Sequence, residues 1–290
     1  MFKGAFTAIV TPFNGGKVDF ERLGKLLEFQ IGEGISGIVP CGTTGESATL
    51  SHDEHQKVVE FVIREVKGRV PVIAGAGSNS TDEAINLTAH AKKVGAAAAL
   101  VITPYYNKPT QEGLFLHFSE VAKKVAIPII MYNVPSRTGV NMLPPTVARL
   151  SKVKNIVGLK EATGDLKQVS EVLELSVPGF TILSGDDFTT LPQLAIGGTG
   201  AISVSSNVAP KDMNDMIISY LDGDHKKARE LHYKLMPLAR AMFIETNPVP
   251  AKAALGLMKK IKPEVRLPQA PLSADSLKEL KKVMKKYGLL

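Results

Sequence analysis

Short apolar runs rich in β-branched residues recur along the first two thirds of the chain. Between most of them lie segments whose apolar residues repeat every three to four positions, for example 20–31, 52–66, 81–94, 113–124 and 166–175. The first pattern predicts buried strands and the second predicts amphipathic helices. We expect eight strands, at 6–11, 37–40, 71–74, 98–102, 129–132, 156–160, 181–184 and 200–203.

Eightfold repetition of strand and helix predicts an α/β fold, a closed (β/α)8 TIM barrel of parallel strands inside a ring of helices. The alternative is an open, doubly wound sheet. That fold marks its dinucleotide site with a Gly-x-Gly-x-x-Gly turn after a strand. The nearest match, which begins at Gly75 and Gly77, lacks the third glycine.

Beyond residue 208 the strand pattern ends and the chain is predicted to be helical at 211–221, 226–243, 251–259 and 274–286. Proline-rich breaks at 247–250 and 268–271 separate the later helices. We therefore predict a catalytic barrel over residues 1–223 and a C-terminal three-helix extension over residues 224–290.

Charge and composition narrow the class of protein. The 290 residues carry a net charge of +7 and contain one cysteine, which excludes an internal disulfide and a cysteine-cluster metal site. No apolar run is long enough for a membrane span and no secretion signal is evident, so we expect a cytoplasmic protein. Ten basic and three acidic residues lie from residue 251 onward. The lysines at 278, 281, 282, 285 and 286 have helical spacing, which favours a solvated helix face over a nucleic-acid surface.

The sixth predicted strand ends in a lysine. In the sequence IVGLKEAT at 156–163, strict alternation would place Ile156, Gly158 and Lys160 on one face, and Val157 and Leu159 on the other. Loss of hydration at a buried strand end favours the neutral, nucleophilic amine, which is the chemistry of a Schiff-base lysine. The alternative is a surface lysine at the end of a strand.

Other reactive side chains follow neighbouring strands. In a barrel the loops after the C-terminal ends of the strands form the active site. These loops contain the hydroxyls of Thr43 and Thr44, two adjacent phenols in 103–109, a further phenol at Tyr132 and the guanidinium of Arg137. An amine, hydroxyls, phenols and a guanidinium on one rim together favour a catalytic site over core packing.

Five motifs resemble the dihydrodipicolinate synthase family over nearly the whole chain. They are GTTGES at 42–47, PYYNKP at 104–109, YNVPSRTG at 132–139, GLKEATG at 158–164 and LSGDD at 183–187. The resemblance implies a (β/α)8 barrel with a C-terminal helical extension. It also implies condensation of pyruvate with L-aspartate 4-semialdehyde to 4-hydroxy-tetrahydrodipicolinate, in the diaminopimelate route to lysine, without a cofactor.

The resemblance assigns roles to individual residues. Lys160 is the Schiff-base residue, Tyr132 shuttles protons, Thr43 and Tyr106 complete the proton relay, and Tyr106 comes from the neighbouring subunit. Thr44 and the backbone of Gly185 and Ile202 match the groups that hold pyruvate, and Arg137 matches the arginine that receives the semialdehyde carboxylate. The family resemblance further implies a homotetramer built as a dimer of dimers.

The same resemblance implies feedback inhibition by L-lysine at a second site. The matching positions are Ser47, Ala48, Leu50, His52, His55, Asn79, Glu83 and Tyr105. Glu83 suits an ammonium group, and neutral histidines can accept hydrogen bonds from the other. His52 and His55 have helical spacing that could hold a metal, but a pair without further ligands does not favour one, and we predict no metal site.

Two alternatives remain from the sequence. N-acetylneuraminate lyase and 2-keto-3-deoxy sugar acid aldolases share the barrel, the lysine and the tyrosine. They usually differ at the threonine pair and lack an arginine at the position of Arg137, so the sequence favours the synthase. A catalytically inactive barrel that binds nucleic acid through its basic C-terminal helices is the alternative from another class.

Overall fold

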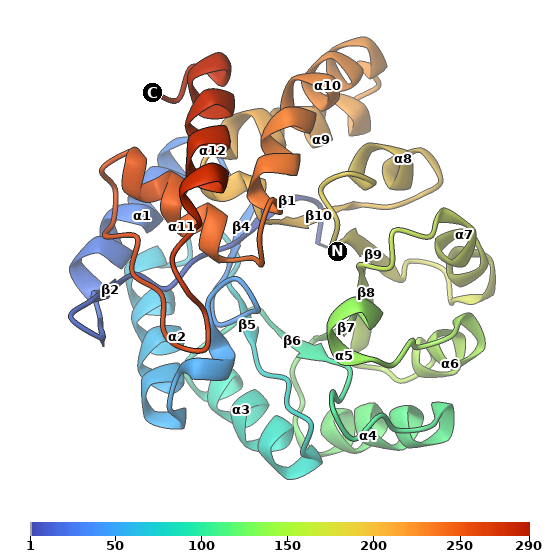
Figure 1. Ribbon diagram of the computed structural model, residues 1–290. Helices are drawn as coiled ribbons and strands as arrows, with labels where there is room; N and C mark the ends of the chain where they lie inside the picture. The colour runs from blue at the N-terminus through green and yellow to red at the C-terminus, as the bar shows by residue number, and fades with distance from the viewer. Residues whose placement is uncertain (1) are drawn as a thin grey trace.

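Eight parallel strands form one sheet that closes into a barrel. The computed structural model describes residues 2–290 (Figure 1). The hydrogen-bonded strand order is β4-β1-β10-β9-β8-β7-β6-β5, and a parallel bridge between Ile38 and Val72 joins the two edges. The strands are β1 (Gly4–Ala8), β4 (Gly37–Val39), β5 (Ile73–Gly75), β6 (Ala98–Ile102), β7 (Ile129–Asn133), β8 (Ile156–Glu161), β9 (Thr181–Ser184) and β10 (Gly200–Ser203). The predicted (β/α)8 barrel is confirmed.

Helices surround the barrel, as Figure 1 shows. The helices that follow the strands are α1 (Phe20–Gly32), α2 (His52–Val66), α3 (Thr81–Lys93), α4 (Gln111–Lys124), α6 (Pro144–Leu150), α7 (Leu166–Leu175), α8 (Thr190–Ala195) and α9 (Pro210–Leu221). Periodicity predicted the longer ones to within a few residues. Periodicity did not predict the shortest elements, because segments of two to seven residues carry no clear period. These are α6, α8, the one-turn helix α5 (Pro135–Thr138) and the hairpin of β2 (Phe13–Asn14) and β3 (Lys17–Val18).

Apolar side chains fill two layers. One cluster occupies the barrel interior and contains Phe6, Leu100, Ile130 and Leu183 among others. Two larger clusters fill the space between the strands and the helices. Because both faces of each strand are buried, the strands are apolar almost throughout, as parallel strands of barrels are.

Strand β8 does not alternate as predicted. Leu159 packs outward and Lys160 points inward, but Ile156 belongs to the outer cluster and Val157 packs against the interior one. The pairing register with β7 shifts here, from Ile129 opposite Ile156 to Ile130 opposite Gly158. This irregularity, which a period of two cannot reveal, inverts the first two residues and leaves Lys160 inside.

Three helices complete the chain: α10 (His225–Met242), α11 (Val249–Leu257) and α12 (Ala274–Tyr287). Figure 1 shows α11 and α12 near α1 and β4, and α10 beside α9. Leu235, Ala254 and Met284 belong to the same apolar cluster as Leu27 of α1 and Val62 of α2. The boundary at residues 223 and 224 stays a prediction, and the apolar core runs across it.

The lysines of α12 form its solvated face, as predicted. Lys278, Lys281 and Lys285 are exposed, whereas Leu280 and Met284 are buried. Within residues 2–290, no helix has the length and apolar content needed to cross a bilayer.

Candidate active site

Lys160 lies inside the C-terminal end of the barrel. It is in register with Tyr132 of β7 and with Leu183 of β9, and both of those residues belong to the interior cluster. Lys160 is only 6% exposed, and its Nζ lies 4.1 Å from the centroid of the Tyr132 ring. The fold therefore places a buried amine beside a phenol, as a lysine nucleophile with a nearby proton-transfer group requires.

A cavity of about 320 Å³ lies over this pair. Its walls come from the loops that follow five strands and from the segment before α11. The lining residues are Thr43, Thr44, Tyr132, Val134, Ser136, Arg137, Lys160, Ala162, Thr163, Gly164, Gly185, Asp186, Val204, Phe243 and Asn247. The structure thus brings together six of the eight residues expected to be catalytic or substrate-binding.

Gly185 leaves room for the lysine side chain. A Cβ atom at this position would lie 2.9 Å from Cε of Lys160 and 2.7 Å from Cβ of Ala162. The Gly185 N–H donates to the carbonyl oxygen of Glu161 (2.7 Å). The Gly185 N–H is therefore already bonded, and the space that a side chain would fill is left to Lys160.

Thr44 is oriented by the C-terminal segment. Its Oγ1 accepts a hydrogen bond from Nδ2 of Asn247 (3.0 Å), and the residue is 2% exposed. Because the amide occupies an acceptor site, the threonine O–H is free to donate to an anionic ligand. Gly45 of the same turn accepts a hydrogen bond at its carbonyl oxygen from Oγ1 of Thr11 (2.6 Å), which ties the turn to the segment after β1.

Arg137 lies at the mouth of the cavity. The one-turn helix α5 carries it, and its Nη2 donates to the backbone carbonyl of Asn247 (3.3 Å). The residue is exposed, so its remaining donors face solvent and an incoming substrate. A guanidinium in this position can hold a carboxylate with two parallel hydrogen bonds.

Two buried acids support the loops around the cavity without lining it. Asp187 accepts hydrogen bonds from the N–H groups of Val204 and Ser205, and Glu161 accepts one from the side chain of Asn133. Burial raises the pKa of both carboxyls. Their role in this structure is to fix the loops after β8, β9 and β10.

Cys41 is an unreactive thiol in this environment. It is 3% exposed, and burial raises the pKa of its thiol far above the ordinary value. Because the thiolate is the nucleophile, this residue does not compete with Lys160. Cys41 is therefore a small buried residue of the core.

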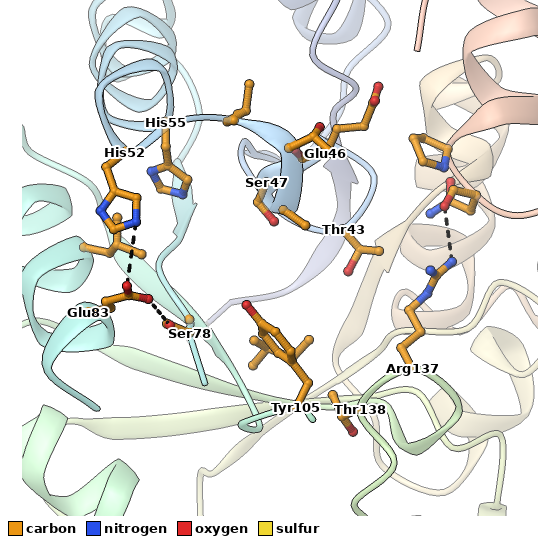
Figure 2. A pocket seen from close by; sticks show the side chains of 18 of the residues that line it. Thr43, Glu46, Ser47, His52, His55, Ser78, Glu83, Tyr105, Arg137 and Thr138 are labelled. Carbon is orange, nitrogen blue, oxygen red and sulfur yellow. Dashed lines mark hydrogen bonds and ion pairs between the residues drawn. The ribbon is translucent and has the colours of Figure 1, made fainter. Parts of the chain in front are cut away.

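A second cavity of about 350 Å³ adjoins the first (Figure 2). Seven of the eight residues expected at the lysine site line it: Ser47, Ala48, Leu50, His52, His55, Glu83 and Tyr105. Figure 2 shows His52 and Glu83 on one side and Thr43 and Arg137 on the other. Because Thr43 and Arg137 line both cavities, the two spaces share a wall.

Charge in the second cavity centres on Glu83. Its Oε1 lies 3.9 Å from Nε2 of His52, and its Oε2 accepts a hydrogen bond from Ser78 (2.5 Å). Burial, with smaller effects from the charges of His90 and His52, lowers the pKa of His55 to about 4, so this ring is neutral at physiological pH. Burial and then the charge of Glu83 raise the pKa of Tyr105. Glu46 and Arg137 also line this cavity, but Glu46 is paired with the ammonium of Lys252, which leaves Glu83 as the carboxylate that suits a cationic ligand.

Three expected site residues line neither cavity. Tyr106 is 89% exposed, with a φ of 71° in the left-handed region. Asn79 accepts a hydrogen bond at its backbone from the side chain of Asn107. Ile202 is packed in the barrel interior. Within residues 2–290, no group of three or more potential metal ligands gathers in a way that could hold a metal ion.

Asn247, Glu46 and Lys252 were not anticipated. Asn247 orients Thr44 and supports Arg137, and Lys252 forms a buried ion pair with Glu46 (2.5 Å). The sequence holds one signal for them: Lys252 interrupts the apolar helix VPAKAALGL, and a lysine in such a helix requires a partner when it is buried. Nothing local in the sequence identifies that partner.

A barrel with a buried lysine and a phenol at the carboxyl end of its strands is the architecture of the Schiff-base lyases. The model of the "Dihydrodipicolinate synthetase family" matches residues 1–287, and this chain belongs to that family.

Similar proteins agree with this assignment. The chain is 60% identical over 290 residues, and over 100% of both chains, to 4-hydroxy-tetrahydrodipicolinate synthase of Syntrophus aciditrophicus (strain SB). The dihydrodipicolinate synthase of Acinetobacter baumannii, solved chloride-inhibited and complexed with pyruvate, has a TM-score of 0.98 at 43% identity and covers 100% of both chains. That of Cyanidioschyzon merolae, solved with lysine bound, has a TM-score of 0.97 at 40% identity and covers 100% of this chain and 99% of its own.

Proposed function

We propose that this protein is a lyase that condenses pyruvate with L-aspartate 4-semialdehyde to give 4-hydroxy-tetrahydrodipicolinate, through a Schiff base on Lys160. The observation that carries the proposal is the buried Lys160 amine, 4.1 Å from the centroid of the Tyr132 ring and under a cavity. Family membership agrees with it, and so do curated relatives named 4-hydroxy-tetrahydrodipicolinate synthase, one of which is 60% identical to this chain.

The first steps activate pyruvate. The Lys160 nitrogen adds to the ketone carbon, the oxygen takes a proton, and loss of water leaves an iminium. The iminium draws electrons from the methyl group, which loses a proton to give an enamine. Tyr132 is the side chain beside the amine that can carry these protons, and Thr43 and Tyr106 are its proposed relay partners.

The groups proposed to hold pyruvate, Thr44 and the backbone of Gly185, each already make one hydrogen bond within the protein. Thr44 lines the cavity, and because its Oγ1 accepts from Asn247, its O–H remains free to donate to the pyruvate carboxylate. The Gly185 carbonyl can accept from the hydroxyl of the first adduct. We assign the backbone of Ile202 to the same subsite on family resemblance alone.

The second substrate enters beside Arg137. Its carboxylate pairs with the guanidinium, which places the aldehyde carbon toward the enamine. The enamine carbon attacks the aldehyde, Tyr132 protonates the new alkoxide, and the substrate nitrogen then displaces Lys160 from the iminium carbon. This last step closes the ring and returns the free lysine.

The relay needs a second subunit. Tyr106 is 89% exposed and lines neither cavity of its own chain. We propose a tight dimer in which each Tyr106 enters the partner's site, and a homotetramer built from two such dimers. Mixing Tyr106→Phe and Lys160→Ala variants under subunit exchange should restore part of the activity that each lacks. An active monomer in sedimentation would contradict the dimer.

We further propose that L-lysine binds the second cavity as a feedback inhibitor. L-lysine has two ammonium groups. The carboxylate of Glu83 can pair with one of them, and neutral His55 can accept a hydrogen bond from the other ammonium group. Its wall includes Thr43, so a ligand there can act on the proposed relay directly. A biosynthetic role of this kind belongs in the cytoplasm, without nucleic acid or membrane as a partner.

A coupled assay tests the proposed reaction. Pyruvate and the semialdehyde offered together should give turnover, and either alone should give none, whereas Lys160→Ala should lose nearly all turnover because no other group supplies the imine. Turnover with N-acetylneuraminate or a 2-keto-3-deoxy sugar acid, but none with the semialdehyde, would assign the site to one of the related lyases instead.

A further inference from the structure

A buried ion pair joins the threonine loop to the C-terminal helices. Nζ of Lys252 lies 2.5 Å from Oε1 of Glu46, and the two side chains are 0% and 2% exposed. Lys252 belongs to α11, whereas Glu46 ends the turn that contains Thr43 and Thr44. The two residues are separated by 206 positions in the sequence. A pair so completely removed from water is stable only when its geometry is well satisfied.

Both members of the pair have further partners. The second Glu46 oxygen accepts a hydrogen bond from the backbone N–H of Arg266 (3.2 Å), and the Lys252 ammonium lies 4.0 Å from the centroid of the Phe13 ring. Arg266 also donates to the carbonyl oxygen of Thr49 (2.9 Å), just beyond the turn. The carboxylate therefore has contacts from the C-terminal segment on both of its oxygens.

The backbone of this turn is strained. Glu46 has a φ of 55°, and Cys41 at the start of the turn has a φ of 53°. A residue other than glycine costs free energy in this left-handed region and remains there only where its surroundings hold it. The ion pair supplies such a restraint at Glu46, at the end of the turn opposite Cys41.

A second tether from the same segment acts on the same turn. Asn247, just before α11, donates to Oγ1 of Thr44. The C-terminal segment thus holds the turn at two positions, Thr44 and Glu46, through two side chains five residues apart. Neither Glu46 nor Lys252 lines the cavity over Lys160, so neither can touch a substrate there.

We propose that Glu46 and Lys252 are positioning residues for the reaction, whose buried pair fixes the turn and so holds the Thr43 and Thr44 hydroxyls at the cavity. This inference rests on the proposed function. The C-terminal helices then contribute to the reaction, because Lys252 of α11 holds the turn that contains the two threonines through its ion pair with Glu46.

The variant that tests this is Glu46→Leu/Lys252→Met. Replacing both members of a buried pair by apolar residues of similar size keeps stability near that of the native protein, whereas replacing one leaves a buried charge unpaired. The matched control is Glu112→Leu/Arg149→Met, which removes an exposed ion pair between α4 and α6 on the outside of the barrel.

Cys41 provides a readout that does not depend on activity. It is the only cysteine of the chain, it lies in the strained turn, and it is 3% exposed. Its labelling by dithiobis-nitrobenzoate well below the melting temperature therefore reports opening of this turn. The double variant should label about tenfold faster than the native protein, and the control should label at the native rate.

The second readout is kinetic. The double variant should lose about tenfold in kcat/KM for pyruvate and in the rate of the borohydride-trapped adduct. The KM for the semialdehyde should change less than twofold, because Arg137 is held by Asn247 and not by the pair. If the double variant does not fold, Glu46→Gln/Lys252→Met, which keeps the shape of the Glu46 side chain and leaves no buried charge unpaired, replaces it with the same expectations.

The outcomes separate cleanly. If the double variant labels Cys41 and traps pyruvate at the native rates, the positioning role is overturned. Equal losses of activity toward pyruvate and the semialdehyde would also overturn it, because they indicate a general loss of structure. Failure of the native protein to trap pyruvate would instead refute the proposed function, and faster labelling of Cys41 in the variant would still show that the pair holds the turn.

Discussion

The close approach between Gly185 and Lys160 gives the sharpest test of the site geometry. Replacing Gly185 by alanine adds one carbon atom, 2.9 Å from Cε of Lys160, 3.1 Å from its Cγ and 2.7 Å from Cβ of Ala162. The backbone at Gly185 does not have a positive φ, so the substitution introduces no backbone strain of its own. Its whole effect comes from this contact.

The size of the effect follows from the distances. Carbon atoms in favourable contact lie about 3.5–4.0 Å apart, so Cε must move by roughly 0.6–1.1 Å, or the loop must move by as much. Displacing a reacting group by about 1 Å costs about 10²-fold in rate, which corresponds to about 2.7 kcal/mol. We therefore expect Gly185→Ala to form the pyruvate imine about 10²-fold more slowly.

The assay mixes enzyme with pyruvate, reduces samples with borohydride at intervals and follows the fraction of adduct by intact mass. The control is Gly32→Ala at the end of α1, where no atom lies within 4 Å of the added carbon and φ is again not positive. That variant should trap pyruvate at the native rate. A Gly185→Ala enzyme with imine formation within twofold of native would refute the placement of Lys160 against this loop.

Three further predictions follow from the same structure. Arg137→Ala should reduce kcat/KM for the semialdehyde by about 10²-fold, which lies within the roughly 2–5 kcal/mol expected when a charged hydrogen-bonding partner is removed. The rate of pyruvate trapping should stay within twofold of the native rate. Equal losses in the two measurements would make Arg137 a structural residue. Millimolar lysine should inhibit the native enzyme and the Asp82→Ala control, and inhibition should be lost in Glu83→Ala; full inhibition of Glu83→Ala would remove the regulatory site. Burial lowers the pKa of His117 from 6.5 to about 4. Between these two pH values the unfolded chain therefore binds more protons at this residue than the folded protein does. The stability that is present above pH 6.5 is lost as pH falls toward 4. Denaturant titrations should therefore show that this group lowers the free energy of unfolding by about 2 kcal/mol between pH 8 and 5, and this loss should be absent in His117→Asn. The same dependence of the free energy of unfolding on pH in the two proteins would contradict the effect of burial.

Periodicity predicted the barrel because each strand is buried on both faces and each long helix on one. The same physics limits the prediction. The first strand was expected at 6–11 but is Gly4–Ala8, since the apolar residues that follow it are buried in a loop rather than in the sheet. The inversion of Ile156 and Val157 arises from pairing with β7, which local sequence does not encode.

Most of the candidate site could be placed from sequence because it sits at strand ends on one rim. Lys160, Tyr132, Thr44 and Arg137 line one cavity for that reason. The supporting residues Asn247 and Lys252 could not be placed from the sequence, because they come from the C-terminal segment. Asn247 lies 203 positions from Thr44, and only the packing of α11 against the barrel brings them together.

The chemistry at Lys160 is tested most directly by locating the trapped adduct. The enzyme is incubated with pyruvate, reduced with borohydride, digested and examined by peptide mass spectrometry. We expect a single reduced adduct, on the peptide that contains Lys160, and none when Lys160 is replaced by alanine. An adduct on another lysine, or no adduct in the native enzyme, would contradict the assignment of Lys160 as the Schiff-base residue.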